Sequence, residues 1–322
     1  MGIESSAHTF GVGIVSNGKI LSNEKIMFDI GTQGIIPAKA ADFHAERAGE
    51  IISASLAKAK VKITDITGIG YTKGPGLGPC LRVGQLAART IADERAIPIV
   101  PVNHAMGHIE VTRHLAKAKD PIVLYVSGGN SQILGIVDEP FRHYHIFGET
   151  FDIGVGNMLD SFAREAKLNP AWGSSVAKLA EGGKYMLMPY TVKGMDFTFT
   201  GLLTHSTRML KEKPPKDVAY SMQETAFAML CEATERALLL TKKREILLSG
   251  GVAQSKRLSE MMRLMAKQHN TTVSVAPNEY NADNGAMIAL VAEKMIQHNM
   301  KFTFEQCDIN QKYRIDKAEL GW

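Results

Sequence analysis

The sequence predicts an α/β fold of two related lobes, and three observations support that prediction. Short apolar strands alternate with helical patterns along the 322 residues, which is typical of α/β sheets. The segment 2–15 reads as strand, small-residue turn and strand, and the segment 125–137 repeats that rhythm and ends on the same Gly-Ile-Val. Each segment is followed by a further β-rich stretch, at 19–29 and 142–147, so the repeat predicts two related sheets.

The remaining elements follow in order from apolar periodicity. In the first half we expect helices at 38–60 and 81–94 and strands at 68–72 and 97–102. In the second half we expect helices at 157–167, 217–240, 255–268 and 283–298, and strands at 245–249 and 272–276. The predicted domains are an N-terminal lobe over 1–118, a C-terminal lobe over 119–299, and a tail over 300–322 that packs back on the first lobe.

A duplicated unit of three strands followed by βα units resembles the actin, hexokinase and Hsp70 (ASKHA) superfamily. That resemblance implies a nucleotide in the cleft between the lobes, with its phosphates against the hairpin turns; the site residues below add a metal ion beside it. Fold alone does not fix function, so the function has to come from the site residues.

Composition sets modest bounds on function. The chain is 45% hydrophobic and 22% charged, which is enough for an ordinary core. The net charge of +4 permits contact with nucleic acid without demanding it. No run of about 18 apolar residues occurs, so we expect neither a signal peptide nor a membrane span. Three widely spaced cysteines, without a CxxC pair, favour a reduced cytosolic compartment: Cys80, Cys231 and Cys307.

Two histidines four residues apart, His104 and His108, follow an apolar strand and open a helix. This spacing places both imidazoles on one helix face, within reach of one metal ion, although a pair of ordinary helix histidines is the alternative interpretation. Asp283, just before a predicted helix, is the best third ligand, although a plain helix N-cap is the alternative interpretation. The HExxH pattern of metalloproteases needs a glutamate where Ala105 stands. Two histidines and one carboxylate suit iron or zinc with open positions for substrate.

Two diglycine turns follow apolar strands, one at 127–129 and one at 249–251. Glycine has no Cβ, so its backbone N–H can approach an anion closely, although a tight hairpin without a ligand fits the first turn equally well. The second turn leads into a helix near Ser255, an arrangement typical of anion sites. The loop 73–79 lacks the Gly-Lys-Ser/Thr ending of a Walker loop, so we expect it to form a wall of a cleft and not to bind phosphate. Asp160 lies on a predicted helix, where it could accept a hydrogen bond from a sugar hydroxyl, although an ordinary exposed helix aspartate is the alternative interpretation.

The combination of these motifs resembles the tRNA adenosine threonylcarbamoyltransferase family, whose members once carried the name O-sialoglycoprotein endopeptidase, over nearly the whole chain. The motifs recur in the family's order: His104-x-x-x-His108, 125–132, 148–150 with Asn157 and Asp160, 250–253 and 283–287. Residues 3–9 and Tyr125 resemble the archaeal and eukaryotic branch, the catalytic subunit of the KEOPS complex. The resemblance implies metal ligands at His104, His108, Tyr125 and Asp283, of which His104, His108 and Asp283 act in catalysis through the metal. It also implies nucleotide contacts at Tyr125, Val126, Ser127, Gly128, Gly129, Asp160, Gly173 and Ser255.

The resemblance implies a metal-dependent acyl transfer in tRNA processing. Threonylcarbamoyl-AMP would donate its threonylcarbamoyl group to the exocyclic amine of the adenosine next to the tRNA anticodon, and AMP would leave. That amine is a weak nucleophile because its lone pair is delocalised into the purine, so activation must fall on the carbonyl. The resemblance implies one metal ion per chain, with iron favoured over zinc. It also implies ATP, AMP or threonylcarbamoyl-AMP as ligand. The implied partners are tRNA, a small dimerising KEOPS subunit and a kinase-like ATPase, sometimes fused at the carboxy terminus, all in the cytoplasm.

Two departures from the family pattern affect the expected ribose and base contacts. The family's Pro-Gly-Gly-Pro turn reads Ala171-Trp-Gly-Ser174 here, and Ala177 stands where a glutamate is expected. The asparagine usual after Gly-Gly-Val-Ala is displaced, which leaves Gln254 and Ser255. Three rival functions remain: a metalloprotease, disfavoured by Ala105; an ATP-dependent small-molecule kinase, which needs no HxxxH; and a noncatalytic nucleotide-binding subunit.

Overall fold

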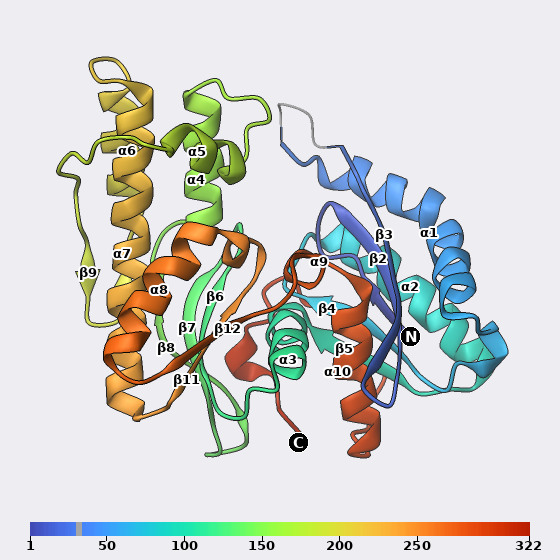
Figure 1. The fold of residues 1–322 in the computed structure, drawn as a ribbon. Coiled ribbons are helices and arrows are strands. Elements are labelled where there is room, and N and C mark those ends of the chain that lie inside the picture. Colours follow the sequence, from blue (N-terminus) through green and yellow to red (C-terminus); the bar gives the residue numbers. More distant parts are fainter. Residues whose placement is uncertain (30–33) are drawn as a thin grey trace. The chain divides into compact units, whose positions relative to one another are not determined.

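The computed structural model describes residues 1–29 and 34–322. In it the chain forms two compact units, and the first comprises residues 1–114, 137–144 and 277–322. Its five-stranded sheet has the order β3-β2-β1-β4-β5 (Figure 1). The strands are β1 (Gly2–Glu4), β2 (Thr9–Ser16), β3 (Lys19–Met27), β4 (Ile69–Gly74) and β5 (Ile99–Asn103). β1 to β3 form an antiparallel meander, and β4 and β5 run parallel to β1.

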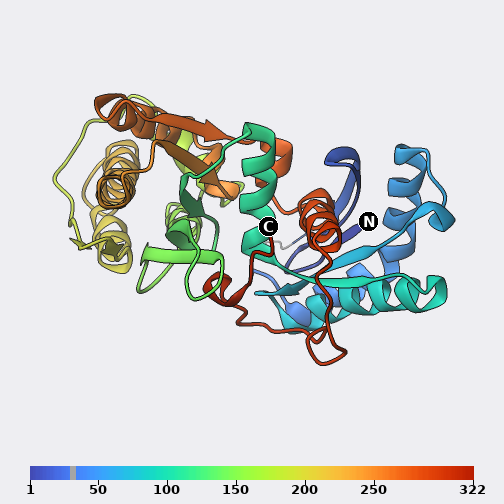
Figure 2. The same ribbon diagram turned by 90° about the horizontal axis from the view of Figure 1, so that it is seen from below.

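Helices cover both faces of this first sheet. α1 (Pro37–Ala59) and α2 (Gly78–Arg95) pack on one face, over a core that includes Ile3, Phe10 and Val12. α10 (Gly285–Gln297) packs on the other face, against β1, β2 and β4 (Figures 1 and 2). Glycines allow this close approach, because a Cβ built on Gly2 would lie 2.1 Å from the Ala289 nitrogen.

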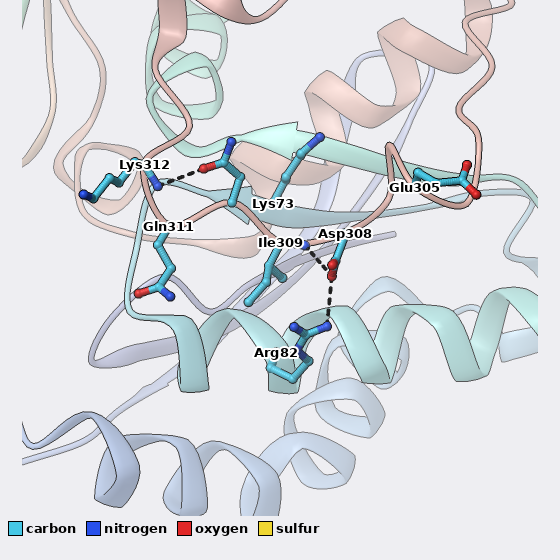
Figure 3. Close-up of a pocket in the computed structure, with 8 residues that line it drawn as sticks. Lys73, Arg82, Glu305, Asp308, Ile309, Gln311 and Lys312 are labelled. Carbon is cyan, nitrogen blue, oxygen red and sulfur yellow. Dashed lines mark hydrogen bonds and ion pairs between the residues drawn. The ribbon is translucent and has the colours of Figure 1, made fainter.

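The segment after α10 also belongs to the first unit. The Lys73 ammonium donates to the Gln306 carbonyl at 2.7 Å, and the Asn103 amide donates to the Tyr313 carbonyl at 2.8 Å. Figure 3 shows Arg82 of α2 paired with Asp308 across a surface pocket, at 2.9 Å. Both side chains of that pair are more than half exposed, so the backbone contacts contribute more to holding this segment than the ion pair does.

The second unit comprises residues 115–136 and 145–276. Its sheet has the order β12-β11-β6-β7-β8, with β6 antiparallel to β7 and parallel to β11. The strands are β6 (Ile122–Val126), β7 (Ser131–Val137), β8 (His143–Glu149), β11 (Glu245–Ser249) and β12 (Thr272–Val275). Counted from β8, this order repeats that of the first sheet: the third strand, the second, the first, then two strands reached through helices. The predicted α/β fold with two related sheets is therefore confirmed.

The helices of the second unit enclose its main core. They are α4 (Val155–Glu165), α5 (Gly173–Ala180), α6 (Thr200–Met209), α7 (Pro215–Thr241) and α8 (Lys256–Gln268). Apolar residues of α4 and α7, including Phe162, Met222 and Phe227, pack together with strand residues such as Leu124 and Leu248. In the described part of the chain, no helix is both long enough and apolar enough to cross a bilayer.

Most expected elements occur within a few residues of their predicted limits, and three differences matter. α5, α6 and the small hairpin of β9 (Val192–Lys193) and β10 (Asp196–Phe197) were not predicted. The last long helix begins at Gly285, with Asn284 as its N-cap, and not at Asp283. The compact units place residues 277–322 together with the first sheet, whereas the sequence prediction ended the second lobe at residue 299.

Candidate functional site

The two histidines lie on the first turns of α3 (His104–Ala116), which follows β5 without a loop. Asn103 ends the strand and caps the helix, since its Oδ1 accepts from the Met106 N–H at 3.1 Å. The imidazoles of His104 and His108 are 4.7 Å apart between ring centroids and nearly perpendicular. They are only 9% and 1% exposed, so both rings are held by packing. The predicted placement on one helix face is therefore confirmed.

Asp283 reaches these histidines from the loop before α10. Its Oδ1 lies 3.1 Å from His108 Nε2 and 3.6 Å from His104 Nε2. The N-cap of α10 is Asn284, whose Oδ1 accepts from the Met287 N–H at 3.0 Å. The alternative that Asp283 is a simple N-cap is therefore wrong, because its neighbour performs the capping and leaves the Asp283 carboxylate to the histidines.

Within the described residues, His104, His108 and Asp283 form a group that fits a metal ion. Each contributes one donor atom, and these atoms all lie within 4.8 Å of one another. Imidazole nitrogen and carboxylate oxygen are the donors that zinc and non-haem iron take in proteins. Three protein donors also leave positions open for a substrate, as catalytic sites require.

Electrostatics favours a cation at this position. Burial lowers the pKa of His108, so its imidazole is neutral and available as a ligand. Burial acts to lower the pKa of His104 too, but the charge and hydrogen bond of Glu4 outweigh it and raise the pKa to about 9. Burial acts to raise the pKa of Asp283, yet the hydrogen bond with His108 and the charge of His104 hold it below its usual value. A positive charge is thus stabilised between two carboxylates, and a metal ion can replace the proton.

Glu4 is the site residue that the sequence analysis missed. It lies on β1, is fully buried, and its Oε2 is 3.0 Å from His104 Nδ1. A charged residue inside the short apolar strand 2–4 was the available signal, because buried carboxylates occur where partners satisfy them.

The first diglycine turn belongs to the second unit and follows β6. The Ser127 N–H donates to the Asn130 carbonyl at 2.8 Å, which closes the turn. The start of α4 lies against it, since the Asn157 N–H donates to the Gly128 carbonyl at 3.0 Å. Gly128 and Gly129 are exposed, and a Cβ on Gly129 would meet nothing within 4 Å. The turn therefore presents open backbone, as an anion-binding loop requires.

The second diglycine turn lies beside the end of the same strand. A Cβ on Gly250 would come 2.4 Å from the Val126 carbonyl oxygen and 3.3 Å from the Tyr125 ring, and its φ of +95° also favours glycine. Two of the predicted nucleotide segments thus meet at one edge of the second sheet. Tyr125 is buried on β6 in this unit, whereas the His104, His108 and Asp283 group is in the first unit, so its role as a metal ligand stays a prediction.

The other predicted nucleotide contacts divide into two places. Asp160 on α4 accepts the N–H of Gly173 at the start of α5, at 2.7 Å, and burial raises the pKa of its carboxyl. Asp160 and Gly173 therefore lie together, with Ala177 one turn further along α5. Ser255 is the N-cap of α8, and its hydroxyl accepts from the Leu258 N–H at 3.3 Å. That capping bond uses one lone pair of the Ser255 hydroxyl and leaves its O–H free to donate, and the nucleotide contact of Ser255 stays a prediction.

Sequence comparison gives a consistent set of similar proteins. Residues 17–290 match the family model for tRNA N6-adenosine threonylcarbamoyltransferase. The chain is 46% identical to the tRNA N6-adenosine threonylcarbamoyltransferase of Thermococcus sibiricus, over all of this chain and 99% of that protein. It is 45% identical to a probable bifunctional tRNA threonylcarbamoyladenosine biosynthesis protein of Thermoplasma acidophilum, of which it spans 61%.

Structural comparison places the fold. The crystal structure of HypF from T. kodakarensis matches with a TM-score of 0.65 at 16% identity, covering 95% of this chain and 49% of that one. Component A of the Acidaminococcus fermentans (R)-2-hydroxyglutaryl-CoA dehydratase matches with a TM-score of 0.55 at 16% identity, covering 92% and 98%. These neighbours share the ASKHA architecture, which the sequence predicted for this chain.

Proposed function

The chain belongs to the tRNA N6-adenosine threonylcarbamoyltransferase family, and from that membership we propose that it transfers a threonylcarbamoyl group to tRNA. The acceptor is the exocyclic amine of the adenosine next to the anticodon, and the donor is threonylcarbamoyl-AMP. The ATP-dependent kinase and the noncatalytic subunit are not favoured, because relatives that match this chain over 98–99% of their own length carry the transferase name.

The observation that best supports the proposal is the convergence of His104, His108 and Asp283 in the first unit. These residues would hold one metal ion per chain, iron before zinc, with Tyr125 as a fourth ligand on the strength of the family resemblance. A metal held by these residues would polarise the carbamoyl carbonyl as a Lewis acid and would neutralise phosphate charge. The chain's own contribution is a set of donors made of two largely buried imidazoles and one partly exposed carboxylate.

Nucleotide binding falls to the second unit in this proposal. The exposed backbone of Gly128 and Gly129, on a turn closed by Ser127 and Asn130, offers N–H groups to the phosphate of the adenylate. Asp160 and Gly173 would take the ribose and base side, with Ser255 beyond the second diglycine turn. Fixed donors of this kind orient the acyl adenylate without reorganisation during the reaction.

We further propose that the chain works with partners in the cytoplasm. Two curated relatives of which it spans 61% are named as probable bifunctional biosynthesis proteins, which supports a fused or associated second activity. The family branch suggests a small dimerising KEOPS subunit and a kinase-like ATPase. The three free cysteines are compatible with a reducing compartment.

The decisive experiment is transfer of labelled threonine to unmodified tRNA from threonylcarbamoyl-AMP, with and without those partners. Label in tRNA that depends on the chain and is lost with His104→Ala supports the proposal. ATP-dependent phosphorylation of a small molecule, with no label in tRNA under either condition, would contradict it and favour the kinase.

A further inference from the structure

We propose that Glu4 is a positioning residue for the metal site: it fixes which nitrogen of His104 carries the hydrogen, and thereby sets the metal affinity. This inference rests on the proposed metal site, since it concerns how one of its ligands is oriented. Glu4 itself lies behind His104, on the Nδ1 side of the ring, while the Nε2 side faces Asp283.

The Glu4 carboxylate is fully buried and accepts from three donors. Its Oε1 accepts from the Ser6 N–H at 2.6 Å, and its Oε2 accepts from the Thr72 hydroxyl at 2.6 Å. The third donor is His104 Nδ1, 3.0 Å from Oε2. An ionised carboxylate can only accept hydrogen bonds, so the hydrogen on a neutral His104 ring has to be on Nδ1. The Nε2 lone pair then points away from Glu4 and is available to a metal.

The backbone around Glu4 leaves this carboxylate little freedom. β1 is an interior strand of the first sheet, with Ile3 paired to Tyr71 on β4, and the Glu4 to Thr72 hydrogen bond continues that register. The following residue is equally confined, because a Cβ on Gly84 of α2 would lie 2.2 Å from Ser5 Oγ. Carboxylates that accept from a ligating histidine in this way typically change metal affinity 10–100-fold when they are replaced.

The isosteric change Glu4→Gln tests the idea sharply. The Ser6 N–H is a fixed backbone donor, so the glutamine oxygen has to face it and the amide NH2 has to face His104. That NH2 can only donate, so His104 Nδ1 becomes the acceptor and the ring hydrogen moves to Nε2. A protonated Nε2 cannot ligate, although shape and burial are unchanged.

The experiment measures zinc affinity of the full chain by competition with a chromogenic chelator. We expect Glu4→Gln to bind zinc on the order of 10–100-fold more weakly than the wild type. Thr72→Val, which removes one donor and leaves the carboxylate, should lose less. Glu110→Gln is the matched control: Glu110 is another fully buried glutamate, on α3, with Lys294 and Arg113 as partners, and zinc affinity should be unchanged.

A second measurement does not depend on any variant folding. In the zinc-loaded wild type, ¹⁵N-correlated NMR of the histidine side chains should find the His104 hydrogen on Nδ1 and the metal on Nε2. The opposite tautomer, or equal zinc affinity in the wild type and Glu4→Gln, would overturn the role of Glu4 and leave the proposed function standing. A wild type that binds neither zinc nor iron at these residues would overturn both the role of Glu4 and the proposed metal site.

Discussion

Asp283 and Asn284 are neighbours at the start of α10, and their side chains have different roles: one faces the histidines and the other caps the helix. Asn284 accepts the helix N–H group, and Asp283 faces the histidines. The sequence predicted that His104 and His108 share a helix face, because a spacing of four residues can be read directly from it. Asp283 was only the best candidate for a third ligand, and the family resemblance implied all three together. Glu4 was not legible, because only the tertiary structure shows that its carboxylate meets His104 and Thr72.

The histidines lead to a first prediction at this scale. His104→Ala and His108→Ala should each retain native circular dichroism and lose the bound metal. The loss of affinity should exceed the roughly 10–100-fold typical of residues behind the ligands, because a donor atom itself is removed. Elemental analysis after dialysis measures it. His114→Ala, on the same helix and outside the group, is the control, and full metal occupancy in both ligand variants would refute the assignment.

Ala177 leads to a second prediction about the ribose. It lies on α5 one turn after Gly173. Its methyl group cannot accept a hydrogen bond from a ribose hydroxyl, whereas a carboxylate at this position could. Calorimetry should find only a small difference between ATP and 2′-deoxy-ATP in the wild type. Ala177→Glu should enlarge that difference, since a hydrogen bond to a charged group is worth about 1.5–3 kcal/mol.

The next residue on the helix provides the control for that experiment. Lys178→Glu changes the charge of the same helix at an exposed position and should leave the difference small. Strong discrimination by the wild type, or no change in Ala177→Glu, would show that the ribose does not lie there.

At the scale of elements, the sequence predicted those whose signals are local. Long, largely buried helices such as α7 and apolar strands such as β11 were predicted close to their observed limits. α6 was not, because its first N–H groups are capped from a distance: Asp152 accepts from Phe199 and Thr200, nearly fifty residues away in sequence. A helix cap supplied by a residue so distant in sequence cannot be recognised from the residues next to the helix.

The contact between α10 and the first sheet gives a prediction about stability. A Cβ on Gly13 would lie 2.3 Å from the Ala286 nitrogen, so Gly13→Ala forces β2 and α10 apart. We expect a loss of about 1–3 kcal/mol or more in the free energy of unfolding. Gly49→Ala is the matched control: it lies inside α1 with open space around it, and should gain roughly 0.5–1 kcal/mol. Urea denaturation compares them, and equal stabilities would contradict the packing.

At the scale of the whole molecule, the three thiols predict slow chemical modification. All are buried, and burial raises the pKa of Cys80 to about 11 and that of Cys231 to about 12, and also raises that of Cys307. The thiolate is the reactive form, so little is present near pH 8. Ellman's reagent should react slowly with the native protein and rapidly with all three thiols in denaturant. A thiol that reacts at once in the native state would contradict this burial.

The charge of the whole chain predicts dependence on partners. A net charge of +4 supplies few of the phosphate contacts that produce tight, salt-sensitive tRNA binding. The isolated chain should bind adenine nucleotides yet modify tRNA slowly, and the proposed partners should raise the rate. Filter binding over a salt series, beside the labelled transfer assay, measures both. Rapid modification by the chain alone would refute the prediction.

The discontinuity of the first unit has a consequence for biosynthesis. Gly2 and Gly13 pack against α10, and Asp283 meets His104, so this unit needs segments from both sides of residues 145–276. Domains generally fold in the order in which the ribosome delivers them. The second unit is therefore synthesised, and can fold, before α10 of the first unit has been synthesised. Until then, the face of the first sheet that α10 covers stays exposed. If the proposed metal binds at His104, His108 and Asp283, it can be loaded only after residues 277–297 have been synthesised and have packed on the first sheet.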